Sequence, residues 1–386
     1  MADWTQDTHG FETLAIHAGQ DPDPTTGAVV VPIYQTSTYA QSEVGVHQGY
    51  EYSRSGNPTR TALETCLAAL EGGRTGLAYA SGLAAEDCLL RVLTKPGAHL
   101  VIPDDAYGGT YRIFARVLDK WDVAFTPVVL SDLDAVRAAM RRETVAIWCE
   151  TPTNPLLGIA DIAGLASIAH DSGARLVVDN TFASPYLQQP LALGADVVVH
   201  STTKYVGGHS DVVGGALVTS DEGLGEELRY FQNAMGGVPG AFDSWLVMRG
   251  AKTLGVRMDR HCSNAERVVE LLQASDKVAR VLYPGLPEHP GHDVAAKQMR
   301  AYGGMVSFTL ADGEGAALEV CRRTKVFTLG ESLGGVESLI EHPGKMTHAS
   351  VAGSQLEVPA DLVRLSVGIE TVEDLLEDLR QALAGV

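Results

Sequence analysis

The stretch of sequence that decides the fold is Val197-Val198-Val199-His200-Ser201-Thr202-Thr203-Lys204-Tyr205-Val206-Gly207-Gly208-His209. Its apolar, β-branched beginning predicts a buried strand, so Lys204 follows that strand after a run of hydroxyl side chains. Partial burial lowers the pKa of a lysine, and a neutral amine can form a Schiff base with an aldehyde. A single lysine after a strand is more often a surface residue, so the rest of the chain must decide its role.

The composition is that of an acidic globular protein. The chain has 386 residues, of which 45% are hydrophobic, and a formal net charge of −19; this length favours two domains. The charge disfavours nucleic acids and anionic membranes as partners, because both require basic patches. The five cysteines show no CxxC spacing, and no segment has the character of a secretion signal or a membrane span. We expect a cytoplasmic protein with reduced thiols.

A second motif lies at the start of a predicted helix. Residues 76–80 predict a short strand, which runs into Ser81-Gly82-Leu83 at the start of a helix that extends to Leu93. The first turn of a helix presents free backbone N–H groups and the positive end of the helix dipole. Such a turn can bind a phosphate, although a motif this short also occurs often without a ligand.

Three more residues of chemical interest follow predicted strands. Tyr107 comes after the strand at 99–103, Asn154 after the strand at 145–149, and Asp179 after the strand at 174–178. Taken singly, each is explained equally well as a loop, turn or capping residue. Parallel strands bring their carboxyl ends to one edge of a sheet, however, and open α/β proteins bind ligands at that edge.

Together these residues predict a cofactor. The sheet edge would hold an amine, a carboxylate, a flat aromatic ring and a phosphate seat. Pyridoxal 5′-phosphate (PLP) requires these four groups, because the amine captures its aldehyde and the carboxylate keeps its pyridine nitrogen protonated. The ring of the tyrosine would stack on the cofactor, and the helix start would anchor the phosphate.

These motifs in combination resemble the Cys/Met-metabolism family of PLP-dependent enzymes, and within it the cystathionine γ-lyases and γ-synthases. The resemblance extends from about residue 13 to the C-terminus. The segments that carry it are Tyr-Ser-Arg-Ser-Gly-Asn-Pro-Thr at 52–59, Tyr-Gly-Gly-Thr at 107–110, Glu-Thr-Pro-Thr-Asn-Pro at 150–155, Asp-Asn-Thr-Phe at 179–182, Ser-Thr-Thr-Lys-Tyr at 201–205, Gly-His-Ser-Asp at 208–211, Ser-Leu-Gly-Gly-Val-Glu-Ser-Leu at 332–339, Met-Thr-His-Ala at 346–349 and Arg-Leu-Ser-Val-Gly-Ile-Glu at 364–370.

The resemblance implies the PLP-dependent type I (aspartate-aminotransferase-like) fold, which is of the α/β class. Its large domain would surround a mostly parallel, seven-stranded sheet at 61–245, and a smaller α/β domain would occupy 246–386 with a linking helix at its start. Residues 1–60 would form an extended arm with little core of its own, in contact with a neighbouring subunit. Periodicity in the second half predicts a long helix at 244–274, strands at 303–310, 325–329 and 362–367, and a helix at 371–384.

The resemblance also implies roles for individual residues. Lys204 would bond the cofactor aldehyde, Asp179 would pair with the pyridine nitrogen, and Tyr107 would stack on the ring and assist proton transfers. The other expected residues divide by what they bind. The phosphate ligands would be Ser81, Gly82, Leu83, Ser201 and Thr203, with Tyr52 and Arg54 reaching the phosphate of the neighbouring subunit. The substrate α-carboxylate would be held by Arg364, Asn154 and Ser338, and the distal end of the substrate would face Arg112 and Glu337.

The implied reaction is a γ-elimination or a γ-replacement on a sulfur-containing amino acid. A cystathionine γ-lyase converts cystathionine into cysteine, 2-oxobutanoate and ammonia, whereas a cystathionine γ-synthase joins an activated homoserine ester to cysteine. The C-terminal motifs favour the lyase slightly. Gly109 counts against a methionine γ-lyase, and Leu339 counts against a cystathionine β-lyase. A specialised enzyme with another γ-substituted substrate remains open, as does a non-catalytic binding protein, which would not need the lysine, aspartate and arginine together.

Two further expectations concern partners. The resemblance implies a small-molecule amino-acid substrate and a homotetramer built as a dimer of dimers, with each site shared across a dimer. No metal is expected, because the histidines show no metal-ligand spacing. These histidines are His209, His261, His289, His292, His342 and His348.

Overall fold

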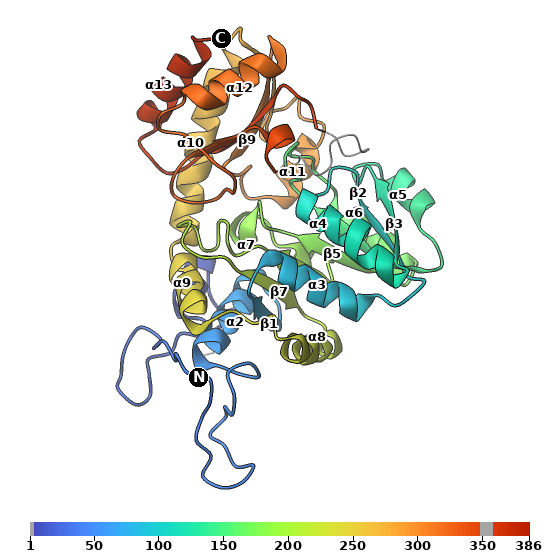
Figure 1. Ribbon diagram of the computed structural model, residues 1–386, viewed down its shortest axis with the longest axis vertical. Helices are drawn as coiled ribbons and strands as arrows, with labels where there is room; N and C mark the ends of the chain where they lie inside the picture. The colour runs from blue at the N-terminus through green and yellow to red at the C-terminus, as the bar shows by residue number, and fades with distance from the viewer. Residues whose placement is uncertain (1–3, 348–357) are drawn as a thin grey trace.

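A computed structural model describes residues 4–347 and 358–386 (Figure 1). The Met-Thr-His-Ala motif at 346–349 therefore lies only partly within the described residues, and His348 lies outside them. Two β-sheets, each with its own helices, form the body of the molecule. Among the described residues, no helix has the length and apolar character needed to cross a membrane.

The larger sheet has the predicted seven strands. They are β1 (Thr75–Tyr79), β2 (His99–Pro103), β3 (Ala124–Val128), β4 (Thr144–Glu150), β5 (Arg175–Asp179), β6 (Val197–His200) and β7 (Gly215–Thr219), in the spatial order β1-β7-β6-β5-β4-β2-β3. Only β7 runs antiparallel to its neighbours. The carboxyl ends of β1, β2, β4, β5 and β6 therefore lie along one edge of the sheet, as the sequence predicted.

Helices cover both faces of this sheet. On one face lie α3 (Gly82–Leu93) and α8 (Glu222–Met235), which pack on β1, β6 and β7. On the other face lie α2 (Pro58–Glu71) and α6 (Ile162–Asp171). The remaining helices of this half are α4 (Gly108–Arg112), α5 (Leu133–Ala139) and α7 (Ser184–Leu187), with short irregular turns η1 (Ile113–Val117), η2 (Leu118–Trp121) and η3 (Pro190–Leu193). Apolar strand residues are buried on both sides, which is why the predicted strands are continuous hydrophobic runs.

The smaller sheet lies in the C-terminal part. Its strands are β8 (Val278–Leu282), β9 (Met305–Leu310), β10 (Thr328–Leu329), β11 (Leu339–Glu341) and β12 (Leu362–Ser366), in the order β10-β11-β12-β9-β8. The helices α10 (Leu254–Gln273), α12 (Gly313–Arg323) and α13 (Val372–Leu383) share one hydrophobic core with it. The short elements α11 (His292–Gln298) and η4 (Pro343–Lys345) complete this half. The strand predicted at 325–329 is shorter than expected, because Asp378 binds the backbone N–H groups of residues 325–327.

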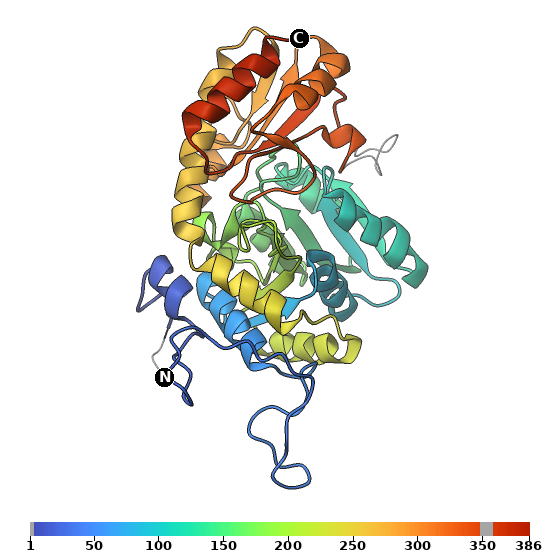
Figure 2. The same ribbon diagram turned by 60° about the vertical axis from the view of Figure 1, so that its left-hand side comes forward.

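The long helix predicted at 244–274 is divided into α9 (Ala241–Ala251) and α10, as Figure 2 shows. The carbonyl of Gly250 accepts hydrogen bonds from Thr253 N and from the Arg257 guanidinium. Because this carbonyl does not continue the helical ladder, the chain changes direction after Ala251. We propose that the domain boundary lies near this break, with 61–245 and 246–386 as the two domains.

The N-terminal arm divides into two parts. Its beginning contains α1 (Phe11–His17), whose residue Leu14 is fully buried and which packs on α2 and α10. This part of the arm is therefore helical rather than extended, and the apolar side of the helix packs on the body of its own chain. After residue 20 the arm contains no helix before α2 and projects away from the body as loops (Figures 1 and 2).

Candidate functional site

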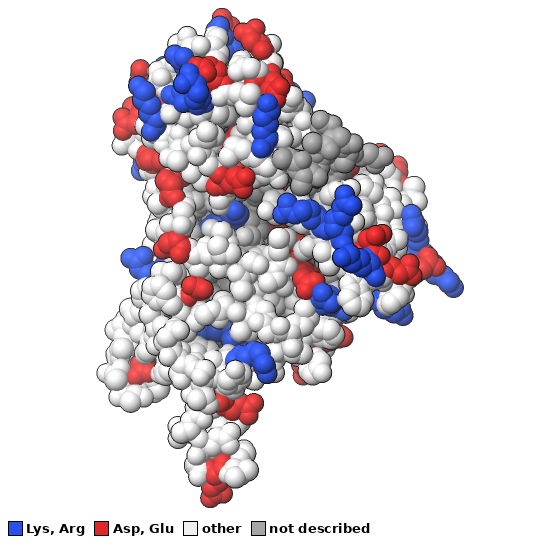
Figure 3. Space-filling view, viewed as in Figure 1, with Lys and Arg blue, Asp and Glu red and all other residues white. Residues whose placement is uncertain are grey.

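The strand ends of the large sheet open into a cavity of about 320 Å³. Figure 3 shows the surface hollowed between the two halves of the molecule. The residues around this cavity come from both halves. Among the predicted site residues, the cavity brings together Ser81, Gly82, Leu83, Tyr107, Asn154, Asp179, Ser201, Thr203, Lys204 and Arg364.

The predicted phosphate seat is the start of α3. The side chain of Ser81 caps this helix by accepting a hydrogen bond from Ala84 N at 3.1 Å, which leaves the N–H groups of the first turn directed at the cavity. A Cβ atom on Gly82 would lie 3.1 Å from the Cβ atom of Ser201, so a larger residue here would require Ser201 to shift by a few tenths of an ångström. Thr203 is less available than predicted, because its hydroxyl bonds to both the carbonyl and the N–H of Gly214.

Lys204 lines the cavity, between residues of the large sheet and the segment that carries Ser332. Burial, and then the positive charge of Arg364, lower its pKa from 10.5 to about 8. Its Nζ atom donates a hydrogen bond to Ser332 Oγ at 2.6 Å. Ser332 has a φ of 85°, a conformation that costs a non-glycine residue about 1–3 kcal/mol. The loop of the smaller domain is therefore held in a strained conformation directly against the lysine.

Asp179 ends β5 and faces the same cavity. Burial raises its pKa, whereas hydrogen bonds from Thr181 and the positive charge of His200 lower it. The Thr181 N–H donates to Asp179 Oδ1 at 3.0 Å. These hydrogen bonds and this charge oppose the effect of burial, so they favour the ionised form of the carboxyl group.

Two carboxyl groups in the cavity were not assigned a role from the sequence. Glu86 accepts a hydrogen bond from Thr110 Oγ1, and its other oxygen has no hydrogen-bond partner in the part of the chain that the structure describes. Glu150 accepts the N–H groups of Tyr107 and Asn154. Burial and then the charge of Asp179 raise the pKa of both groups well above the usual range. An acidic residue in the apolar pattern of α3 was the signal that would have indicated Glu86.

Glu150 explains how two predicted residues reach the site. One carboxyl oxygen binds the backbone of Tyr107 at 2.9 Å and the other binds the backbone of Asn154 at 2.8 Å. The loops after β2 and β4 are therefore fixed to each other. Burial raises the pKa of the Tyr107 hydroxyl, and the nearby Arg112 opposes that effect.

The opposite wall of the cavity comes from the smaller sheet. Arg364, in β12, is almost fully buried and donates to Asn154 Oδ1 at 2.8 Å and to the Ser332 carbonyl at 2.7 Å. It also pairs with Glu341 of β11 at 3.0 Å. Among the described residues, its Nε atom has no hydrogen-bond partner. This arginine therefore has both a fixed orientation and one unused donor.

Other predicted residues lie away from the cavity. The Ser338 hydroxyl donates to Glu370 and accepts from Gly368 N, rather than contacting Arg364. Glu337 is half-buried and Arg112 is exposed, and neither lines the cavity. Tyr52 and Arg54 stack on each other in the arm, with 5.4 Å between the Arg54 guanidinium carbon and the ring centroid. Within one chain, the structure does not bring these residues to Lys204.

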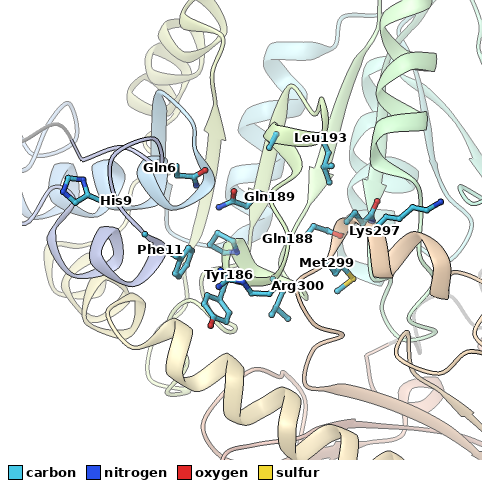
Figure 4. A pocket seen from close by; sticks show the side chains of 15 residues that line it. Gln6, His9, Phe11, Tyr186, Gln188, Gln189, Leu193, Lys297, Met299 and Arg300 are labelled. Carbon is cyan, nitrogen blue, oxygen red and sulfur yellow. Dashed lines mark hydrogen bonds between the residues drawn. The ribbon is translucent and has the colours of Figure 1, made fainter.

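A second cavity, of about 520 Å³, lies elsewhere (Figure 4). It is lined by the N-terminal segment around Phe11, by the turn around Tyr186 and by the segment that carries Lys297 and Arg300. None of the predicted site residues lines it. By volume alone this cavity would be the better candidate for the active site, but the chemistry of the lining side chains favours the smaller cavity.

The residues of the smaller cavity fit PLP. The helix start with its glycine offers a cradle for a phosphate, and Lys204 offers a partly deprotonated amine in the same cavity. Asp179 would supply a buried carboxyl group to face the pyridine nitrogen. Within the described part of the chain, no group of three or more His, Cys, Asp or Glu side chains is arranged to hold a metal ion.

Comparisons with known proteins agree with this arrangement. Residues 12–384 match the family described as Cys/Met metabolism PLP-dependent enzyme. The chain is 63% identical over 379 residues to a cystathionine gamma-synthase of Mycobacterium tuberculosis, with 98% of each chain covered. It is 52% identical over 376 residues to a cystathionine beta-lyase of Lactococcus lactis, with coverage of 97% of this chain and 98% of the relative. A crystal structure of cystathionine gamma-lyase from Lactobacillus plantarum, complexed with L-serine, matches with a TM-score of 0.94 and 46% identity, covering 97% of this chain and 99% of the other.

Proposed function

Because the chain belongs to the Cys/Met metabolism PLP-dependent enzyme family, we propose that it is a cystathionine γ-synthase, which forms cystathionine from an O-acyl-homoserine and cysteine. PLP-dependent chemistry of cystathionine metabolism is common to the family and to its relatives. The synthase is favoured over the lyase indicated by the sequence motifs, because the relatives with 63% identity are synthases.

One structural observation carries the proposal: Lys204, Asp179 and Arg364 face one cavity from two domains. When bound, PLP supplies an electron sink for a negative charge on the substrate Cα atom. Lys204, with a pKa of about 8, is the group that would take the Cα proton and then a Cβ proton before the Cγ substituent leaves. It would return protons at Cβ and Cα after the cysteine thiol has bonded to Cγ. A base with this pKa is partly deprotonated at neutral pH and is suited to both directions of transfer.

Arg364 would bind the substrate α-carboxylate. Its guanidinium is already fixed by Asn154 and by the Ser332 carbonyl, so little side-chain entropy is lost when a carboxylate binds. Its pairing with Glu341 keeps the buried charge compensated when no substrate is present. Tyr107 lies beside this space and would exchange a proton with the group that leaves Cγ.

The second candidate is the γ-lyase. The motif comparison favours it, and the Lactobacillus relative carries that name. Both reactions use the same residues up to the loss of the Cγ substituent. After that loss they diverge, because the synthase must hold a cysteine thiol close to Cγ, whereas the lyase releases the product before a thiol can add.

Substrate turnover by the purified enzyme with bound PLP distinguishes these reactions. With O-acyl-homoserine and cysteine, a synthase forms cystathionine; with cystathionine alone, a γ-lyase releases 2-oxobutanoate and a β-lyase releases pyruvate. We expect rapid cystathionine formation and slow release of either keto acid. Rapid 2-oxobutanoate release without cystathionine formation would establish the γ-lyase instead, and inactivity in all three assays would contradict the proposed reaction class.

We also propose that the site is shared across a dimer within a homotetramer. Tyr52 and Arg54 do not line the cavity of their own chain, and Arg54 Nε donates to Asn233 Oδ1 of α8 at 3.2 Å. Exposed apolar residues such as Val44 and Phe242 would be covered by a second copy, and the projecting region is mainly uncharged in Figure 3.

A mixing experiment tests this arrangement. Lys204→Ala and Arg54→Ala subunits would each give weak enzymes alone. If the site is shared, a mixed dimer has one site with both native residues, and activity returns after the two proteins are unfolded together and refolded. No return of activity, with mixed dimers verified by mass, would show that each site uses its own Arg54.

A further inference from the structure

Asp105 and Thr153 form a contact between two loops of the large sheet. Strands β2 and β4 are parallel neighbours, so the loops that follow them both lie at the carboxyl edge of the sheet. The Thr153 hydroxyl donates a hydrogen bond to Asp105 Oδ2. Neither residue lines the cavity that holds Lys204, and both line a separate cavity of about 80 Å³. The contact therefore lies next to the active site without being part of it.

Thr153 also closes the loop in which it lies. Its hydroxyl accepts the Gly158 N–H at 2.8 Å, and its own N–H donates to the Gly158 carbonyl at 3.0 Å. Its carbonyl accepts the Leu157 N–H at 2.9 Å. Thr153 is buried, so loss of the Asp105 acceptor would leave a buried hydroxyl donor without its partner, which is unfavourable.

The two loops carry groups of the active site. The loop after β2 leads from Asp105 to Tyr107, and Asn154 directly follows the residue that Asp105 binds. Asn154 Oδ1 accepts a hydrogen bond from Arg364 at 2.8 Å. Glu150 joins the same two loops at a second point, through the N–H groups of Tyr107 and Asn154. Two points of attachment resist rotation of one loop against the other, whereas a single point would allow it.

The carboxyl group of Asp105 is suited to this contact. Burial raises its pKa from 3.8 to about 6, and the hydrogen bond from Thr153 opposes that effect. The group is therefore mostly ionised at neutral pH. A carboxylate accepts a hydrogen bond from a hydroxyl more strongly than a neutral oxygen does, so the contact between the loops is strong under assay conditions.

We propose that Asp105 is a positioning residue for substrate binding: through Thr153 it fixes the loop that carries Asn154, and thereby the guanidinium of Arg364. This inference rests on the proposed role of Arg364 toward the substrate α-carboxylate. Asp105 does not touch the substrate. It keeps the groups that do so in place, and a displacement of about 1 Å at such a site lowers the rate of an enzyme about 100-fold.

Asp105→Ala tests the proposal, with L-norvaline as the probe. In this variant the loop after β4 is held to the loop after β2 by Glu150 alone, so Asn154 no longer fixes Arg364 in one orientation. L-Norvaline has the α-amino and α-carboxylate groups of the substrate but no leaving group at Cγ, so the change in PLP absorption reports its binding to the holoenzyme without turnover. We expect its dissociation constant to rise about 10-fold.

Two further variants separate positioning from a general loss of structure. Asp105→Asn keeps an oxygen that accepts from Thr153, so its affinity for L-norvaline should stay within about threefold of that of the unaltered enzyme. The matched control is Asp104→Ala. Asp104 lines the same 80 Å³ cavity but makes no side-chain hydrogen bond to the loop after β4 within the described residues, and its removal should leave the affinity unchanged. If Asp105→Ala lowers the melting temperature but not the affinity, the residue is only structural and the proposal is overturned.

Thr153→Val tests the contact from its other side and serves if Asp105→Ala does not fold. Valine has nearly the shape of threonine but no hydroxyl, so this variant should also weaken the binding of L-norvaline. The double variant should bind it no more weakly than Thr153→Val alone, because the two residues act as one unit. Unchanged affinity in Thr153→Val, or a further loss in the double variant, would overturn the proposal.

Arg364→Lys separates this inference from the proposed function. If that variant binds L-norvaline as tightly as the unaltered enzyme, the role of Arg364 itself is wrong, and the inference about Asp105 fails with it. If Arg364→Lys weakens the binding while Asp105→Ala and Thr153→Val do not, only the role of Asp105 is wrong.

Discussion

The two walls of the cavity carry different kinds of buried ionisable groups. The wall from the seven-stranded sheet and its helices gathers three carboxyl groups, Glu150 and Asp179 at strand ends and Glu86 in α3, and burial raises the pKa of each. The wall from the five-stranded sheet presents one guanidinium, Arg364, which has a carboxylate partner in the neighbouring strand. The first wall therefore carries groups whose charge can change, whereas the second carries a charge that is permanent and compensated.

This difference corresponds to two tasks. Groups with shifted pKa values suit proton transfer and the binding of a cofactor whose own protonation matters. A guanidinium with fixed hydrogen bonds suits recognition, because it binds a carboxylate without changing its own state. Substitutions confined to one wall should therefore alter one task and leave the other intact.

The largest effect is expected from Lys204→Ala. This variant removes the amine that captures the cofactor and transfers the substrate proton, so kcat should fall by about 10³-fold or more, and the visible absorption of bound PLP should change. Steady-state kinetics and absorption spectroscopy check this. The exposed Lys297→Ala is the control and should be unchanged; an active Lys204→Ala would remove the basis for the assignment.

Arg364→Lys tests the opposite wall. Lysine keeps the charge but loses the two-pronged geometry, so the KM for the amino-acid substrate should rise by about 10- to 100-fold, while the PLP absorption stays the same. Arg257→Lys is a matched control, since Arg257 is a buried arginine whose hydrogen bonds to described residues go to backbone carbonyls and a threonine. It should lower stability without raising KM. A changed PLP spectrum in Arg364→Lys would mean that the walls are not separable.

The pH dependence of cofactor capture tests the state of the lysine. The pKa of Lys204 is lowered to about 8, so the neutral amine is present above that pH and lost below it. The rate at which apoenzyme reacts with PLP should rise with pH and level off above about 8. Stopped-flow absorption measures this rate. A rise that continues toward pH 10.5, the ordinary lysine value, would show that burial does not affect this amine.

The smallest effect is expected from Glu86→Gln. The folded-state pKa of Glu86 is raised above 4.5, so the stability of the native enzyme is fully present below about that pH and decreases as pH rises through the folded-state value. Glutamine never ionises. The variant should therefore gain about 1 kcal/mol relative to the native enzyme between about pH 5 and pH 8.

Urea unfolding at the two pH values measures this difference. The exposed Glu373→Gln is the control and should show no change in relative stability. If Glu86→Gln instead loses stability relative to the native enzyme as the pH rises, Glu86 is ionised in the folded enzyme. In that case the pKa of Glu86 is not raised by burial.

Much of the large-sheet wall could be predicted from the sequence. Its functional groups follow buried strands, so Lys204, Asp179 and Tyr107 were recognised by local pattern and placed together by the rules of parallel sheets. The bounds of β2 were predicted correctly for the same reason. Asn154 was found as well, although only the structure shows that Glu150 fixes it to Tyr107.

The other wall could not be predicted from the residues alone. Arg364 lies inside a strand with apolar neighbours, and only the resemblance to the family singled it out. Its partner Glu341 and the strained Ser332 lie in short segments without periodicity, so no local pattern indicated them. Ser338 was expected beside Arg364 but bonds to Glu370, because the loop before β11 turns its hydroxyl toward Gly368.

The sequence by itself determined the fold, the cofactor and the chemistry of the strand ends. Burial patterns and the residue types at strand ends are local properties of the chain, because three or four neighbouring residues are enough to show them. The tertiary structure decided which buried charges have a partner, as in the Asp105–Thr153 hydrogen bond and the Arg364–Glu341 pair. Those pairings join residues that are 48 and 23 positions apart, and the cost of burying a charge depends on its neighbours in space rather than along the chain.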